Sequence, residues 1–209
     1  MIGDRRSGND SERLRSTRSF FAERAAGWDT KFGDDIPVYE AAVTRAGYRP
    51  GCVVADLGCG TGRALPALRT AVGPDGIVLG VEVTSEMLAV TRSTGRATVA
   101  HPLLADALHL PIRDAALGGL FAAGLLNHLP DPEAALVELA RVTGAQGRLV
   151  LFHPIARRAL AARHGREIRD DEALSAGPLR ASLTRTGWEL LEYEDGNDHF
   201  FVLAVRRAG

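Results

Sequence analysis

The chain has 209 residues, 45% of them hydrophobic, which is enough for one well-buried domain. Its 25 basic and 26 acidic residues give a formal net charge of -1, so a nucleic-acid partner is not favoured. No stretch approaches the ~20 consecutive apolar residues that a membrane span needs, and no secretory leader is recognisable. The two cysteines, Cys52 and Cys59, fit neither a disulfide framework nor a zinc site. We therefore expect a cytoplasmic protein with no membrane, nucleic-acid or metal partner.

The first segment, 1–18, is rich in arginine, serine and glycine and has almost no apolar periodicity. We predict a flexible tail there, followed by a single domain over 19–209. Two helices are expected at the start of that domain, over 20–28 and 37–46. The second of them starts on proline and ends at Gly47.

From residue 52 onward, short apolar runs alternate with helical patterns, as in repeated strand–helix units. Thr84 and Asp131 are expected to be the N-caps of two of the helices. The predicted strands occupy 52–57, 77–81, 102–105, 120–123 and 148–152, and the predicted helices occupy 64–72, the stretch after Thr84 and the stretch from Pro132 up to Gly144.

The last third follows a different pattern. A helix opened by Gly177-Pro178 and closed by Gly187 precedes two strand-like runs, at 188–194 and 199–205. The turn between these runs is too short to join parallel strands. The whole pattern predicts an α/β fold of Rossmann-like type, with a doubly wound, mostly parallel seven-stranded sheet whose last strand is antiparallel.

The strongest motif is the run from Asp56 to Gly62, which lies between a predicted strand and a helix. Its glycines let the backbone turn sharply and approach a ligand at the carboxyl edge of the sheet. A dinucleotide-binding loop read from Gly58 requires a small residue at position 63, where this chain has Arg63. Asp56 suits a ligand with an ammonium and a sulfonium better than one with a pyrophosphate.

Residues 54–62 resemble the first motif of class I S-adenosylmethionine-dependent methyltransferases, of the small-molecule, UbiE-like type. Residues 80–88 resemble the second-strand motif of that family. The resemblance implies that Glu82 accepts hydrogen bonds from both ribose hydroxyls, which the two oxygens of a carboxylate can do.

Two later segments extend the resemblance. Residues 105–111 resemble the third-strand segment. There Asp106 would accept a hydrogen bond from the adenine amine, and the N–H of Ala107 or Leu108 would donate one to a ring nitrogen. Residues 123–131 resemble the segment after the fourth strand, whose first backbone carbonyls would accept hydrogen bonds from the methionine ammonium. The implied cofactor-binding set is Asp56, Gly58, Cys59, Gly60, Thr61, Gly62, Glu82, Val83, Met87, Asp106, Ala107, Leu108, Ala123 and Gly124.

The implied reaction moves a methyl group from S-adenosyl-L-methionine to an O, N or C nucleophile of a small molecule by in-line displacement, leaving S-adenosyl-L-homocysteine. His128 and His153 are the candidate general bases, because both follow predicted strands at the edge that faces the cofactor. The acceptor pocket is expected between the front helices and the 155–177 arm. Trp28, Phe32 and Tyr39 are its candidate apolar walls.

Competing interpretations stay open at this point. The domain could bind the cofactor only, as a regulatory or partner subunit, since the sequence does not define the acceptor pocket. A nicotinamide-dependent oxidoreductase is the alternative that Arg63 disfavours. Both histidines and the three aromatic residues also have purely structural interpretations. The sequence predicts neither the acceptor nor the oligomeric state.

Overall fold

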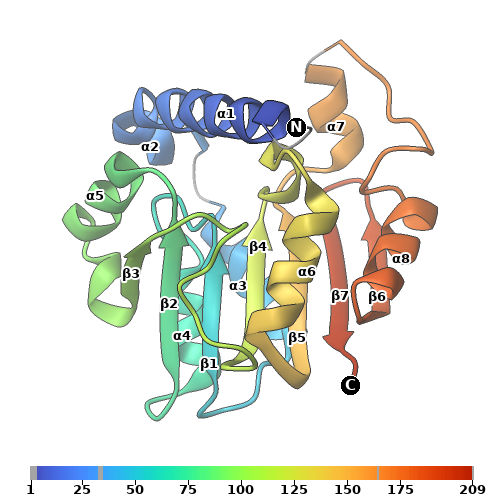
Figure 1. Ribbon diagram of the computed structural model, residues 1–209. Helices are drawn as coiled ribbons and strands as arrows, with labels where there is room; N and C mark the ends of the chain where they lie inside the picture. Colours follow the sequence, from blue (N-terminus) through green and yellow to red (C-terminus); the bar gives the residue numbers. More distant parts are fainter. Residues whose placement is uncertain (1–3, 33–34, 164, 209) are drawn as a thin grey trace.

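A computed structural model describes residues 4–32, 35–163 and 165–208 (Figure 1). Its centre is a seven-stranded sheet with the order β3-β2-β1-β4-β5-β7-β6. Strands β1 to β5 are parallel, and β7 runs antiparallel to both of its neighbours, as the sequence predicted. The strands are β1 (Val53–Leu57), β2 (Ile77–Glu82), β3 (His101–Leu104), β4 (Leu117–Ala123), β5 (Thr143–His153), β6 (Trp188–Asp195) and β7 (Phe200–Arg206).

Helices cover both faces of the sheet. In Figure 1, α6 (Pro132–Val142) and α8 (Ala176–Arg185) lie in front of it, and α3 (Ile36–Ala46) and α4 (Leu65–Val72) lie behind it. Two separate clusters of buried apolar side chains fill the layers between helices and sheet. The doubly wound arrangement is therefore confirmed. The remaining helical elements are α1 (Asp4–Ala22), η1 (Ala25–Gly27), α2 (Trp28–Phe32), α5 (Ser85–Ser93), η2 (Arg96–Val99), η3 (Leu126–His128) and α7 (Arg157–Arg163).

Several predicted helix ends are confirmed by their capping geometry. Asp131 caps α6, since its Oδ1 accepts a hydrogen bond from the N–H of Ala134 at 2.9 Å. Gly47 ends α3 in a left-handed conformation, with φ at 60°. Thr84 precedes α5 as predicted, but its side chain makes no capping hydrogen bond.

Two strands begin earlier than the sequence pattern predicted. β4 includes Gly118 and Gly119, and position 119 requires glycine because a Cβ there would lie 2.4 Å from the ring of Tyr48. β5 begins at Thr143, directly after α6, where Thr143 pairs with Leu117. A register shift then follows in the pairing of the two strands. The predicted strands at 120–123 and 148–152 are therefore the carboxyl-terminal parts of longer strands.

The N-terminal segment is helical, which the sequence pattern did not predict. Residues 4–22 form one helix, α1, which continues through the expected boundary between residues 18 and 19. A polar stretch of this kind becomes helical when tertiary contacts hold its end. Here the ring of Phe21 packs against Trp28 and His128, and α1 also contacts α5. The division of the chain at residue 18 stays a prediction.

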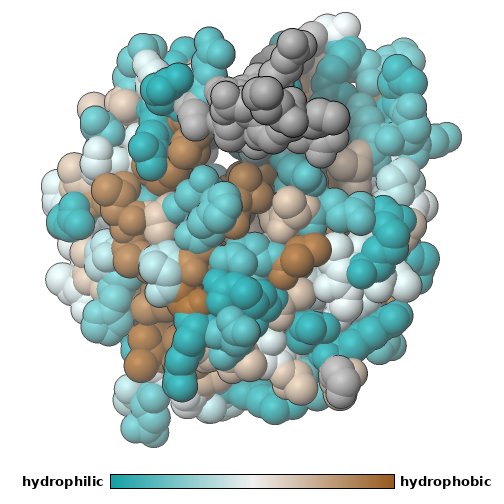
Figure 2. Space-filling model, viewed as in Figure 1, coloured by the Kyte–Doolittle hydropathy of each residue, from teal (hydrophilic) through white to brown (hydrophobic). Residues whose placement is uncertain are grey.

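The front of β2 and β3 has no helix over it, because the chain passes from β3 to β4 through a loop at 105–116. Ile77 and Leu104 of these strands are 42% and 56% exposed. Figure 2 shows hydrophobic residues at the surface on this side of the molecule. None of the helices in the described ranges is long and apolar enough to cross a membrane.

The hydroxyl of Tyr48 provides a test of this packing. It is buried and donates a hydrogen bond of 2.7 Å to the carbonyl of Leu120 in β4. Tyr48→Phe leaves that buried carbonyl without its donor, so the free energy of unfolding should fall by about 1–3 kcal/mol in urea denaturation. Tyr39→Phe is the control, because the Tyr39 hydroxyl has no hydrogen bond within the described part of the chain. Equal losses in the two variants would contradict this assignment.

Candidate active site

The predicted site residues meet at the carboxyl edge of the sheet, where α1 lies across the ends of the strands (Figure 1). The parallel pairing of β1 with β2 places Asp56 beside Gly80 and Leu57 beside Val81. The chain leaves β1 into the glycine-rich loop at 58–62 and leaves β2 at Glu82. Two acidic side chains therefore lie next to one loop, at the position where open α/β sheets bind their ligands.

Glu82 is 7% exposed and holds the backbone of both loops. Its Oε2 accepts from the N–H of Gly60 at 3.0 Å. Its Oε1 accepts from Val83 and Thr84, each at 2.9 Å. Because a carboxylate offers roughly four lone-pair sites, about one acceptor position remains for an outside donor.

Asp56 is in a very different environment, although it is 2% exposed. Its carboxyl group has no hydrogen-bond partner within the described residues. Burial, together with the charge of Glu82, raises the pKa of Asp56 well above its usual range. A buried acid without a partner, beside a second acid, fits a ligand that brings a positive charge.

The three glycines of the loop have different roles, although all have positive φ, at 64°, 53° and 80°. A Cβ at Gly58 would lie 3.0 Å from Leu125, and one at Gly62 would lie 2.8 Å from Leu65. A Cβ at Gly60 would meet nothing within 4 Å. The outer two glycines therefore permit packing, whereas Gly60 borders open space into which a ligand can approach its backbone.

Side chains from other elements fix this loop, and the sequence analysis missed them. Thr91 of α5 donates to the carbonyl of Gly60 at 3.0 Å. Asp29 of α2 accepts from the hydroxyl of Thr61 at 2.6 Å. The N–H of Cys59 bonds the carbonyl of Val81 at 3.0 Å. The only local signal for Thr91 was its position two helical turns after Thr84.

The expected adenine side is formed by Asp106 and its neighbours. The N–H of Leu108 donates to Asp106 Oδ1 at 2.9 Å, so this N–H is engaged within the loop. The N–H of Ala107 has no hydrogen bond within the described residues. Of the two alternatives, Ala107 is therefore the better donor to a ring nitrogen. Met87 is buried, and Val83 is half-buried.

His128 and His153 lie on the acceptor side of the edge. His128 is exposed on one side, while its ring lies edge-on to Phe21 with centroids 5.2 Å apart. His153 ends β5, and its Nδ1 lies 2.9 Å from the carbonyl oxygen and 3.0 Å from the nitrogen of Ile155. Burial lowers the pKa of both histidines, and the charges of His128 and Arg163 lower that of His153 further. Both are therefore neutral, and able to accept a proton, near neutral pH.

Gly124 links the cofactor side to His153. Its φ is 67°, and a Cβ there would lie 3.4 Å from Cδ2 of His153. Its N–H bonds the carbonyl of Phe152 at 2.8 Å. Ala123 is the last residue of β4, directly before it. The backbone expected to receive the methionine ammonium therefore lies next to a candidate base.

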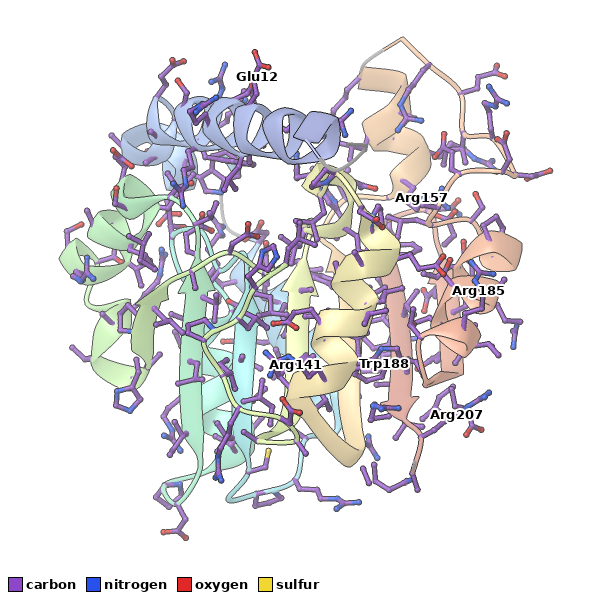
Figure 3. All side chains as sticks on the ribbon, in the orientation of Figure 1. Glu12, Arg141, Arg157, Arg185, Trp188 and Arg207 are labelled. Atoms are coloured by element: carbon purple, nitrogen blue, oxygen red, sulfur yellow. The ribbon has the colours of Figure 1, made fainter. Side chains whose placement is uncertain are left out.

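The candidate acceptor walls differ in their surroundings. Trp28 packs edge-on to Phe21, 5.5 Å away, under α1. Tyr39 packs against Phe152 and Phe121, so it is a core residue, as the structural interpretation of this residue held. The side chain of Phe32 lies outside the described part of the structure. Arg157, which begins α7 (Figure 3), binds Asp195 at 2.8 Å and Glu172 at 3.1 Å, so its charge is balanced.

The donor set has the chemistry of a nucleoside site that carries a positive charge. Asp56 offers an unpaired buried acid, Glu82 a remaining acceptor position, and Gly60 an open backbone. Within the described ranges, no group of three or more His, Cys, Asp or Glu side chains is placed to hold a metal ion. Arg63, which occupies the position where a dinucleotide loop needs a small residue, is buried and directed to Asp29 and Asp35.

The fold and this site define a nucleotide-cofactor-binding α/β domain of the methyltransferase type. Residues 55–151 match the family described as Methyltransferase domain. This match supports the class I S-adenosylmethionine-dependent methyltransferase assignment that the resemblance in the motifs implied.

Individual relatives agree with that assignment. An O-methyltransferase of Pyrenophora dematioidea is 32% identical over 159 residues, which are 72% of this chain and 59% of that protein. The ubiquinone/menaquinone biosynthesis C-methyltransferase UbiE of Burkholderia orbicola is 32% identical over 112 residues, 53% of this chain and 46% of that protein. The chain spans about half the length of the curated relatives that it matches.

The fold is also similar to that of solved methyltransferases. The magnesium protoporphyrin IX methyltransferase of Synechocystis PCC 6803, solved with bound S-adenosylhomocysteine, superposes with a TM-score of 0.70. The match covers 93% of this chain and 99% of that one, at 17% sequence identity.

The environment of Asp56 predicts a specific effect on the stability of the cofactor-free protein. Because its pKa is raised on folding, the folded state retains a proton that the unfolded state loses above pH ~3.9. Asp56→Asn should therefore raise the melting temperature at neutral pH, by about 2–4 °C if the gain is about 1 kcal/mol. The gap to the unsubstituted protein should widen as pH rises from about 4. A variant that melts lower at every pH would contradict this account.

Proposed function

We propose that this domain transfers a methyl group from S-adenosylmethionine to a small-molecule acceptor. The observation that carries the proposal is the buried, unpartnered carboxyl of Asp56 beside the open backbone of Gly60. The sulfonium of the cofactor supplies an already activated methyl group. The chain therefore has to bind the cofactor and the acceptor, orient them and exclude water. Holding the two reactants in line can lower the reaction barrier by about 7–11 kcal/mol in favourable cases.

Each part of the site has a proposed task. Asp56 balances the positive charge of the cofactor, and the remaining acceptor position of Glu82 takes a ribose hydroxyl. Asp106 and the N–H of Ala107 hold the adenine, while Ala123 and Gly124 receive the ammonium. His128 and His153 accept a proton from acceptors that are protonated at working pH.

We propose a small molecule as the acceptor, without specifying the acceptor atom. The relatives' names include an O-methyltransferase and a C-methyltransferase, so the acceptor atom varies among similar proteins. The net charge of -1 gives no support for a nucleic-acid acceptor. We also propose a cytoplasmic location, which the two free cysteines favour.

Calorimetry with S-adenosylhomocysteine and with NAD tests the cofactor assignment. We expect binding of the first compound and none of the second. Binding of NAD alone would overturn the proposal in favour of an oxidoreductase. Transfer of radiolabelled methyl groups into a metabolite extract then separates an enzyme from a binding subunit, since a cofactor-loaded protein that labels nothing would support the binding subunit.

Substitution of Gly60 tests the loop directly. Gly60→Val fills the open space beside the backbone and should abolish binding of S-adenosylhomocysteine in calorimetry. Gly73→Val is the matched control, because Gly73 also has a positive φ and open space around its Cβ position but lies at the far end of α4. If both variants bind equally, the loop does not approach the cofactor.

The histidines predict a pH dependence of turnover. His128→Ala and His153→Ala should leave S-adenosylhomocysteine affinity intact and lower turnover, by about 10²–10⁴-fold for the residue that acts as base. Turnover should rise with pH as that histidine loses its proton. Since the pKa of each is lowered, the midpoint of this rise should lie below the ordinary value of about 6.5. Full turnover in both variants would refute the role of a histidine base.

A further inference from the structure

The segment ahead of β1 is tied to the glycine-rich loop through Asp29 of α2. One carboxylate oxygen, Oδ1, accepts from the hydroxyl of Thr61 at 2.6 Å. The other, Oδ2, accepts from Nη1 of Arg96 at 2.5 Å. Burial opposes the charge on Asp29, yet the hydrogen bonds from Thr61 and Arg96 hold its pKa below the usual value. Asp29 is therefore ionised at neutral pH, and these are charge-assisted hydrogen bonds.

Thr61 is held at two points by this arrangement. While its hydroxyl binds Asp29, its backbone carbonyl accepts from the same Nη1 of Arg96 at 3.0 Å. Thr61 is buried and lies between Gly60 and Gly62, the most adaptable part of the loop. The Asp29–Arg96–Thr61 contacts thus restrain a backbone that its own sequence leaves free.

Arg63 adds a second connection between the same two segments. It is 6% exposed, and its guanidinium pairs with Asp29 at 3.4 Å and with Asp35. Both acids come from the chain ahead of β1. A buried guanidinium needs such partners, since an unpaired buried charge is strongly destabilising. Loss of Asp29 leaves Arg63 bound to Asp35, so removal of Asp29 alone should not unfold the domain.

The same short helix also reaches the acceptor side. Trp28, next to Asp29, packs against Phe21 at 5.5 Å, and Phe21 packs against His128 at 5.2 Å. The stretch from Phe21 to Asp29 therefore contacts the cofactor loop through Asp29 and a candidate base through Phe21. It lies outside residues 55–151, the part that matches the methyltransferase family.

We propose that Asp29 is a positioning residue of the cofactor site, which acts through Thr61 to hold the glycine-rich loop in its ligand-binding conformation. The affinity for the cofactor then depends on the docking of α2 over the sheet edge. This inference rests on the proposed function, because it assumes that the loop binds S-adenosylmethionine and its product.

The test is a double-mutant cycle measured by calorimetry with S-adenosylhomocysteine. Asp29→Asn and Thr61→Val should each weaken binding about tenfold, the effect expected for one charge-assisted hydrogen bond. The double variant should bind about as weakly as either single variant, because both remove the same connection. A purely structural role would instead lower the melting temperature without this coupling in affinity.

Glu192→Gln is the matched control. Glu192 forms a partly buried pair with Arg45, between α3 and β6, and has no contact with the glycine-rich loop. Its loss should reduce thermal stability and leave S-adenosylhomocysteine affinity unchanged. If Asp29→Asn does not fold, Arg96→Gln takes its place in the cycle with Thr61→Val, because Arg96 donates both to Asp29 and to the carbonyl of Thr61.

The outcomes separate this inference from the proposed function. If the unsubstituted protein fails to bind S-adenosylhomocysteine, the proposed function falls. If it binds, and Thr61→Val or a folded Asp29→Asn binds equally well, only the role of Asp29 is refuted. Full additivity in the double variant would also refute it, because Asp29 would then act independently of Thr61.

Discussion

The site depends on a buried acid that the protein itself does not neutralise. The parallel pairing of β1 and β2 places Asp56 beside Gly80, two residues before Glu82 at the end of β2. Glu82 is satisfied by three backbone N–H groups, whereas Asp56 has no hydrogen-bond partner within the described residues. The charge of Glu82 makes ionisation of Asp56 still less favourable. The cofactor-free domain therefore stores an electrostatic cost that a cationic ligand relieves.

The remaining features of the edge can be understood as support for that ligand. Gly58 and Gly62 allow the loop to pack against Leu125 and Leu65, and Gly60 leaves room for the ligand itself. Glu82, Thr91 and Asp29 fix the loop from three different elements. A loop with this many glycines is adaptable by its own sequence, so these contacts supply the rigidity that a binding site needs.

What could be predicted from the sequence depended on how local the physical signal was. The strand–helix alternation, the turn at 195–198 and the motif at 56–62 are each encoded within a few residues, and they predicted the sheet and the cofactor loop. Asp29 and Arg96 were missed because they reach Thr61 across 32 and 35 residues of chain, which no local pattern shows. The helix at 4–22 was missed because its polar sequence lacks periodicity. The early start of β4 was not predicted because glycine has a low strand propensity, whereas Gly119 here makes room for Tyr48.

Proton exchange on binding tests the central claim most directly. Calorimetric titration of S-adenosylmethionine, which carries the sulfonium charge, in buffers of different ionisation enthalpy measures how many protons leave the protein. If a cationic ligand group enters beside Asp56, the pKa of that carboxyl falls and binding should release protons, an effect that Asp56→Asn should remove. Binding without proton release, or release that persists in the variant, would contradict the account.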